Sequence, residues 1–204
     1  MLPRLPGRHG RPQRARPFGL VPTVLAIGLL ASSVAVGCGG GGKGADDPSR
    51  QVVAYSGRQA DLFDDSIEPA AVGLDFDRGY SPRLDKTLRE RAQVGDAVLR
   101  VRVSTVTSKI DGPDATYQLG LHTVEKLAGD HPPPPDFTVQ INKASESHGI
   151  MKNFESRLVG YSFIAFVREF AHPSGDREVH FHLAPDTKEV KAAVGDAMLM
   201  GELK

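Results

Sequence analysis

The chain has 204 residues, and its 25 lysines and arginines balance its 25 aspartates and glutamates. Five of the arginines and none of the acids fall within residues 1–37, so residues 38–204 hold 20 basic against 25 acidic residues, a formal charge of −5. An acidic remainder disfavours nucleic acid as a partner, because phosphate binding needs a basic face. The single cysteine excludes an intrachain disulfide, so a folded part must depend on an apolar core.

The first 38 residues have the pattern of an exported, lipid-modified protein. Five arginines precede an apolar run over residues 18–36, and Gly37 leads directly into Cys38. This order resembles the signal peptide and lipobox of bacterial lipoprotein precursors. The resemblance implies that residues 1–37 are a signal peptide, that the chain is cut between Gly37 and Cys38, and that palmitate-type chains on Cys38 hold the protein in the membrane. The alternative is an uncleaved anchor, because a spanning helix needs roughly twenty apolar residues.

Residues 38–50 are expected to be the lipidated cysteine and a flexible glycine-rich tether. Gly39 follows the cysteine where, in the best-known sorting rule of the lipoprotein family, an aspartate retains the protein in the inner membrane. The resemblance therefore favours the outer membrane, at its periplasmic face or surface, over the inner membrane.

Residues 51–95 are expected to form an acidic segment followed by a helix. The acids over 61–68 lack the spacing and central glycine of an EF-hand, so a calcium loop is disfavoured. Packing on the main domain is expected instead for Leu62, Phe63 and Ile67. The pair Ser81-Pro82 is typical of a helix start, and the helix is expected to end near residue 95.

Residues 96–204 predict a β-rich domain with a C-terminal helix. Alternation of apolar and polar residues predicts five strands, over 97–107, 116–127, 137–142, 162–170 and 178–183. The apolar phase slips at Val124, which predicts a bulge. Both sides of 162–170 are apolar, as in a central strand covered on two faces or a strand that lines a closed barrel. We expect a polar loop over 143–152, and a final helix that Asp186 caps.

The fold class predicted from this order is mainly β with flanking helices (α+β). The stretches GDAVLRVRV, YQLGLHTVEKLAG and LVGYSFIAFV resemble strands of the OB-type barrel, in particular the netrin and tissue-inhibitor module. The resemblance covers about half of the chain and implies a small five-stranded antiparallel barrel. The usual cysteines of that module are missing. Acylation of Cys38 would also block the free amine through which netrin-type inhibitors act, so no inhibitory activity is implied.

His180 and His182 form the clearest candidate site for chemistry. Residues two apart on a strand share a face, so both imidazoles could bind one zinc or copper ion, with His122 or Asp186 as a third ligand. The alternative is that Phe181 and its apolar neighbours face the core while both histidines face solvent. No nucleophile-elbow or zinc-protease motif is present, so no catalytic residue is assigned.

The sequence therefore predicts a lipid-anchored envelope lipoprotein with a non-catalytic domain that binds an envelope protein or a small ligand. No cofactor is expected beyond the lipid on Cys38. The alternative hypothesis is a metal-binding protein or metal-dependent enzyme that uses His180 and His182.

Overall fold

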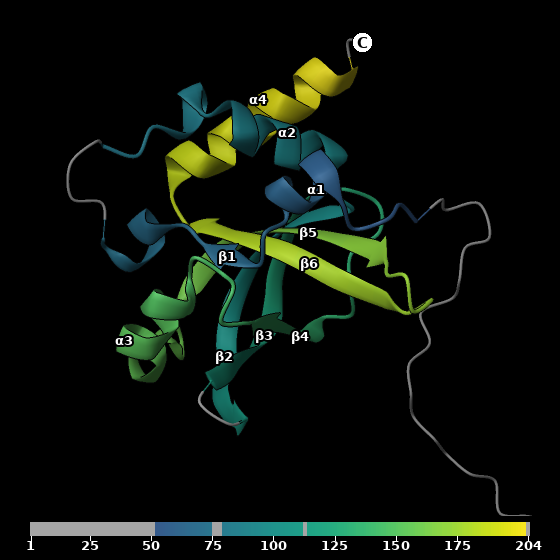
Figure 1. Ribbon diagram of the computed structural model, residues 1–204. Coiled ribbons are helices and arrows are strands. Elements are labelled where there is room, and N and C mark those ends of the chain that lie inside the picture. Colours follow the sequence, from purple (N-terminus) through teal and green to yellow (C-terminus); the bar gives the residue numbers. More distant parts are fainter. Residues whose placement is uncertain (1–51, 75–78, 112–113, 203–204) are drawn as a thin grey trace, which may run out of the picture. The chain divides into compact units, whose positions relative to one another are not determined.

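The computed structural model describes residues 52–74, 79–111 and 114–202 (Figure 1). The predicted signal peptide, cleavage site, Cys38 and tether lie outside these residues. The described elements, in chain order, are α1 (Gly57–Leu62), β1 (Ser66–Ile67), the 3₁₀ turns η1 (Pro69–Val72) and η2 (Pro82–Leu84), α2 (Lys86–Val94), β2 (Ala97–Asp111), β3 (Asp114–Ala128), β4 (Asp136–Ile141), α3 (His148–Leu158), β5 (Ser162–Ala171), β6 (Arg177–Pro185) and α4 (Lys188–Glu202).

The strands form one six-stranded sheet in the order β1-β6-β5-β2-β3-β4. Neighbouring strands are antiparallel except β1, which pairs with β6 in parallel. The α+β class is confirmed, but the five-stranded OB-like barrel is wrong. The sheet is open, with β1 and β4 as its two edges, and β1 is the strand that sequence patterning missed. Two residues are too few to show any alternation.

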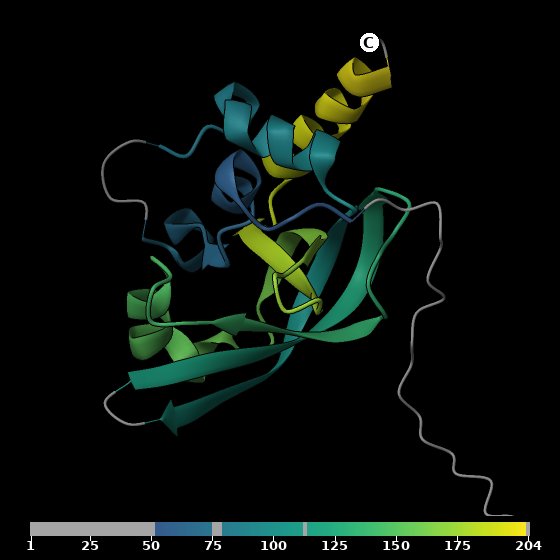
Figure 2. The same cartoon turned by 45° about the vertical axis from the view of Figure 1, so that its right-hand side comes forward.

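Apolar side chains cover both faces of β5, and helices rather than further strands pack on each face. Phe163 and Ala165 join the core that α3 covers, whereas Ile164 and Phe166 join the core beneath α2 and α4. Figures 1 and 2 show α1, α2 and α4 on one side of β5 and β6 and α3 on the other. Of the two interpretations of residues 162–170, the central strand covered on two faces is therefore the right one. Each fully buried phenylalanine contributes about 1.5–3 kcal/mol through area removed from water.

The long β2–β3 pair bends as the sequence predicted. Its register shifts between Arg100 and Val101, whose partners are Glu125 and Thr123, so Val124 is left without a partner. A residue without a partner is a bulge, and it bends its strand. Another shift leaves Ser104 unpaired on β2 and changes which residues face inward. Beyond it Thr105 is exposed, whereas Val106 packs against the core.

The helices begin later than the sequence predicted. The carboxylate of Asp85, not the hydroxyl of Ser81, accepts from the first free backbone N–H groups of α2. At α4 the Thr187 hydroxyl accepts from the Val190 N–H, while Asp186 pairs with Arg100 and Lys191. The predicted end of this helix near residue 95 is confirmed, because α2 ends at Val94. Within the described part of the chain, no helix combines the length and the apolar character that a membrane span needs.

The expected polar loop over 143–152 is wrong in its second half, because α3 begins at His148. The first half of that segment does form a loop, and it binds the outer edge of β1. The Ser147 Oγ accepts from the Ile67 N–H at 2.6 Å and donates to the Ile67 carbonyl at 3.2 Å. The Ser145 hydroxyl donates to the Asp65 carbonyl at 2.8 Å. Two serines thus bind backbone groups that a neighbouring strand would otherwise bind.

Candidate functional site

Strand β6 places His180 and His182 on one face, as the period of a strand requires. That face is the one beneath the helices, because the two histidines pair in register with Arg168 and Phe166 of β5. Both are buried, with 7% and 5% of their surface exposed. The interpretation that set them on a solvent-facing surface is therefore wrong.

An Asp-Asp pair between α1 and β1 binds the two histidines separately. The Asp65 Oδ2 lies 2.8 Å from the His180 Nδ1, and the Asp64 Oδ1 lies 3.2 Å from the His182 Nδ1. Asp65 adopts a positive φ of 52°, a conformation that aspartate tolerates better than most side chains. This kink lets the Asp65 N–H donate to the Phe181 carbonyl while its carboxylate accepts from the Phe181 N–H.

Burial and these hydrogen bonds set the charges of the network. Burial would raise the pKa of Asp64, but hydrogen bonds from His182 and Ser66 hold the pKa below its usual value. Burial raises the pKa of Asp65, which the hydrogen bond from His180 only partly offsets. Burial lowers the pKa of His182, so this imidazole is neutral at pH 7 and Asp64 is ionised. Burial and the charge of Asp65 raise the pKa of Tyr55 to about 12.

The side chains of His172, Glu178 and His180 converge in an arrangement that suits a metal ion. The Nε2 atoms of His172 and His180 lie 3.0 Å apart, and the Glu178 Oε2 lies 3.5 Å from the His172 Nε2. All three candidate ligand atoms lie within 4.8 Å of one another. In the parts of the chain that the structure describes, this is the only such group of three or more. The Tyr55 ring stacks on His180 with ring centres 3.6 Å apart and planes 7° from parallel.

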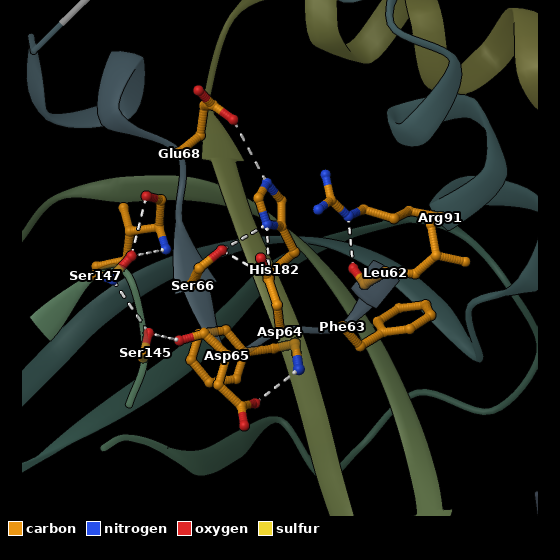
Figure 3. Close-up of polar contacts among 12 residues, drawn as sticks. Leu62, Phe63, Asp64, Asp65, Ser66, Glu68, Arg91, Ser145, Ser147 and His182 are labelled. Atoms are coloured by element: carbon orange, nitrogen blue, oxygen red, sulfur yellow. Dashed lines mark hydrogen bonds and ion pairs between the residues drawn. The ribbon is translucent and has the colours of Figure 1, made fainter. Parts of the chain in front are cut away.

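His182 does not belong to that group and lies in a separate polar network (Figure 3). The Ser66 Oγ lies 3.0 Å from the His182 Nδ1, and the Glu68 Oε2 lies 3.8 Å from the His182 Nε2. A cavity of about 210 Å³ borders these residues and the buried Arg91, whose Nε donates to the Leu62 carbonyl. The Ser66 hydroxyl donates to Asp64 at 2.7 Å rather than to the imidazole, so this serine is not activated as a nucleophile.

The two residues expected as a third ligand lie elsewhere. The His122 Nδ1 pairs with the Asp136 Oδ1 at 2.7 Å on the exposed β3–β4 edge. The Asp186 carboxylate pairs with Arg100 at 2.7 Å and with Lys191 at 2.9 Å. Neither joins His180 in the group of possible metal ligands.

Sequence reasoning missed His172, Glu178 and Asp65 as partners of His180. A signal for the first two was present, because the turn HPSGD over 172–176 predicts a hairpin. Antiparallel pairing across such a turn brings residue 172 close to the next strand, and Glu178 pairs with Phe170 in the structure. Asp65 gave no local signal, since 115 residues separate it from His180.

No protein-family model matches the chain. No curated protein and no solved structure matches it significantly either.

Proposed function

We propose that this chain is a lipid-anchored bacterial envelope protein whose folded domain binds a divalent transition metal ion. The observation that carries the metal proposal is the convergence of His172, Glu178 and His180, with the Asp65 carboxylate behind the buried imidazole. The role is binding rather than catalysis.

The spacing of the ligand atoms fits a tetrahedral ion. Zinc–nitrogen bonds of about 2.0–2.1 Å at a tetrahedral angle separate two nitrogens by about 3.3 Å. The observed separations of 3.0 Å between the two Nε2 atoms and 3.5 Å from the His172 Nε2 to the Glu178 Oε2 bracket that value. The third separation, between His180 and Glu178, is at most 4.8 Å, and the exposed Glu178 side chain can move to close it.

Asp65 prepares His180 for this task. Metal-bound histidines usually donate their second ring N–H to a carboxylate or carbonyl, which fixes the tautomer and the ring orientation. A proton on the His180 Nδ1, donated to Asp65 across 2.8 Å, would leave a lone pair on the Nε2, the atom that faces His172. The stacked Tyr55 ring holds the imidazole plane in place. Two imidazoles and one carboxylate suit zinc or copper better than magnesium or calcium.

The membrane half of the proposal depends on Cys38. Its place directly after an apolar run and Gly37 supports lipidation, and the glycine-rich stretch that follows supports a tethered domain. We propose that the protein resides in the bacterial envelope, at the periplasmic face or surface of the outer membrane in preference to the inner membrane. The −5 charge of residues 38–204 disfavours nucleic acid as a partner, and we propose an envelope protein or a small ligand instead.

Metabolic labelling with a palmitate analogue tests the anchor. We expect label on the wild-type protein and none on Cys38→Ala, because the chain has no other cysteine. Label retained by the variant would rule out Cys38 as the lipidation site.

Metal analysis of the detergent-purified protein after dialysis against zinc or copper tests the domain. We expect one ion per chain in the wild type and at least a tenfold weaker affinity in His172→Ala and Glu178→Gln, whose side chains are 25% and 60% exposed and so tolerate substitution. His122→Ala is the matched control, because this histidine also pairs with a carboxylate but lies outside the group. Equal metal content in all four proteins would refute the proposal.

A further inference from the structure

We infer that the metal keeps one exchangeable position, which opens onto a cavity between β4 and β6 and takes the oxygen of a small carboxylate. This inference rests on the proposed metal site and names the ligand that the metal would hold.

The first step is the number of protein ligands. Structural zinc sites are closed by four protein ligands, whereas sites with three keep a position for water or an exogenous ligand. Among the described residues the group near His180 has three members. Its two outer members, His172 and Glu178, are partly exposed, so water can reach the ion from their side. A metal held here therefore completes its coordination from outside the protein.

The second step is where that position leads. Glu178, His180 and Asp65 form one wall of a cavity of about 250 Å³. The opposite wall comes from β4, which approaches β6 although the two strands are not paired, because the sheet curls. Beyond the short strand β1, the edge of β6 faces this cavity rather than another strand. Two of the three proposed metal ligands, Glu178 and His180, thus border a hollow large enough for a small molecule.

The third step is the chemistry of the opposite wall. Thr138, Gln140 and Asn142 line it, and all three are exposed. They contribute one hydroxyl and two amide groups, which can donate hydrogen bonds without carrying a charge. Neutral donors that line the same cavity as two of the metal ligands match an anion with two oxygens, one for the metal and one for the amides. The volume lies below the roughly 300–1,000 Å³ of drug-sized sites, so the ligand is a small carboxylate.

Cobalt loading followed by acetate titration tests this inference. Co²⁺ is a spectroscopic substitute for zinc, and its visible absorption responds to a change of ligand. We expect a saturable spectral change with acetate and none with the non-coordinating anion perchlorate at equal ionic strength. In Asn142→Ala, acetate binding should weaken about tenfold while Co²⁺ binding is unchanged, as expected for one lost hydrogen bond to a charged group. Gln118→Ala is the matched control, because it removes an exposed amide on β3 that does not line this cavity.

The possible outcomes separate the two proposals. Co²⁺ binding that is lost in His172→Ala, together with a spectrum that acetate leaves unchanged, would overturn the exchangeable position and leave the metal site standing. Acetate binding that Asn142→Ala and Gln118→Ala weaken equally would overturn the role of the β4 wall. Failure of Co²⁺ to bind at all would overturn both the metal site and this inference.

Discussion

Replacing Ser147 with alanine should destabilise the domain through a strand contact rather than through a helix cap. Ser147 occupies the position before α3, where serine commonly caps, yet its hydroxyl makes no bond to that helix. It binds the N–H and the carbonyl of Ile67 instead, at 2.6 and 3.2 Å. Both residues are 1% exposed, so the substitution leaves a buried N–H of β1 without its partner.

The expected cost follows from these two bonds. An unsatisfied buried donor costs about 1–3 kcal/mol, and the longer bond to the carbonyl contributes about 0.5–1 kcal/mol. Water in the cavity that Ile67 and Ser147 border replaces part of the lost bonding. We therefore expect a loss of about 2 kcal/mol, which for a domain of this size lowers the Tm by about 4–8 °C.

Urea unfolding followed by far-UV circular dichroism measures this loss, with Ser156→Ala as the matched control. Ser156 is exposed on α3, and its replacement should change stability by less than about 0.5 kcal/mol. Hydrogen exchange at the Ile67 amide should accelerate about 30-fold in Ser147→Ala, the ratio that about 2 kcal/mol represents. Equal stability of the two variants, or accelerated exchange confined to α3, would refute the strand-edge role.

Three further perturbations probe the fold. Gly129→Ala should cost at least about 2 kcal/mol of stability by thermal denaturation, because φ is +84° and the new Cβ would overlap the backbone at the start of β2. The control Gly149→Ala, with open space around it, should be neutral or slightly stabilising. Asp186→Asn should cost about 1–2 kcal/mol at pH 7. Burial would raise the pKa of Asp186, but its two cationic partners hold the pKa below the usual value. The difference in free energy of unfolding between wild type and variant should therefore be complete above about pH 4 and shrink as the pH falls further. A difference that grows in acid would contradict this. Phe170→Ala, at a fully buried ring, should cost about 3–5 kcal/mol in urea unfolding, and Leu84→Ala, at a side chain 78% exposed, less than about 0.5 kcal/mol.

Local patterning predicted the buried residues correctly wherever the face of a single strand or helix decides burial. The alternation around Leu119 predicted which side of β3 is buried, and the slip at Val124 predicted the bulge. Patterning failed where a segment is short or polar. β1 has two residues, and the start of α3 follows a serine-rich loop, so neither shows a sustained period. The prediction of a closed barrel failed because apolar residues on both faces of a strand do not indicate whether helices or other strands cover those faces.

The amino-acid order by itself determined the α+β class, the shared face of His180 and His182, and the expectation that Cys38 carries lipid. Only the tertiary structure decided which partners those histidines meet. Asp65 reaches His180 because β1 lies in parallel beside β6, a pairing between segments 115 residues apart. Local sequence sets the direction of a side chain through backbone periodicity, but its partner depends on how the whole chain packs, and packing is a property of all the elements together.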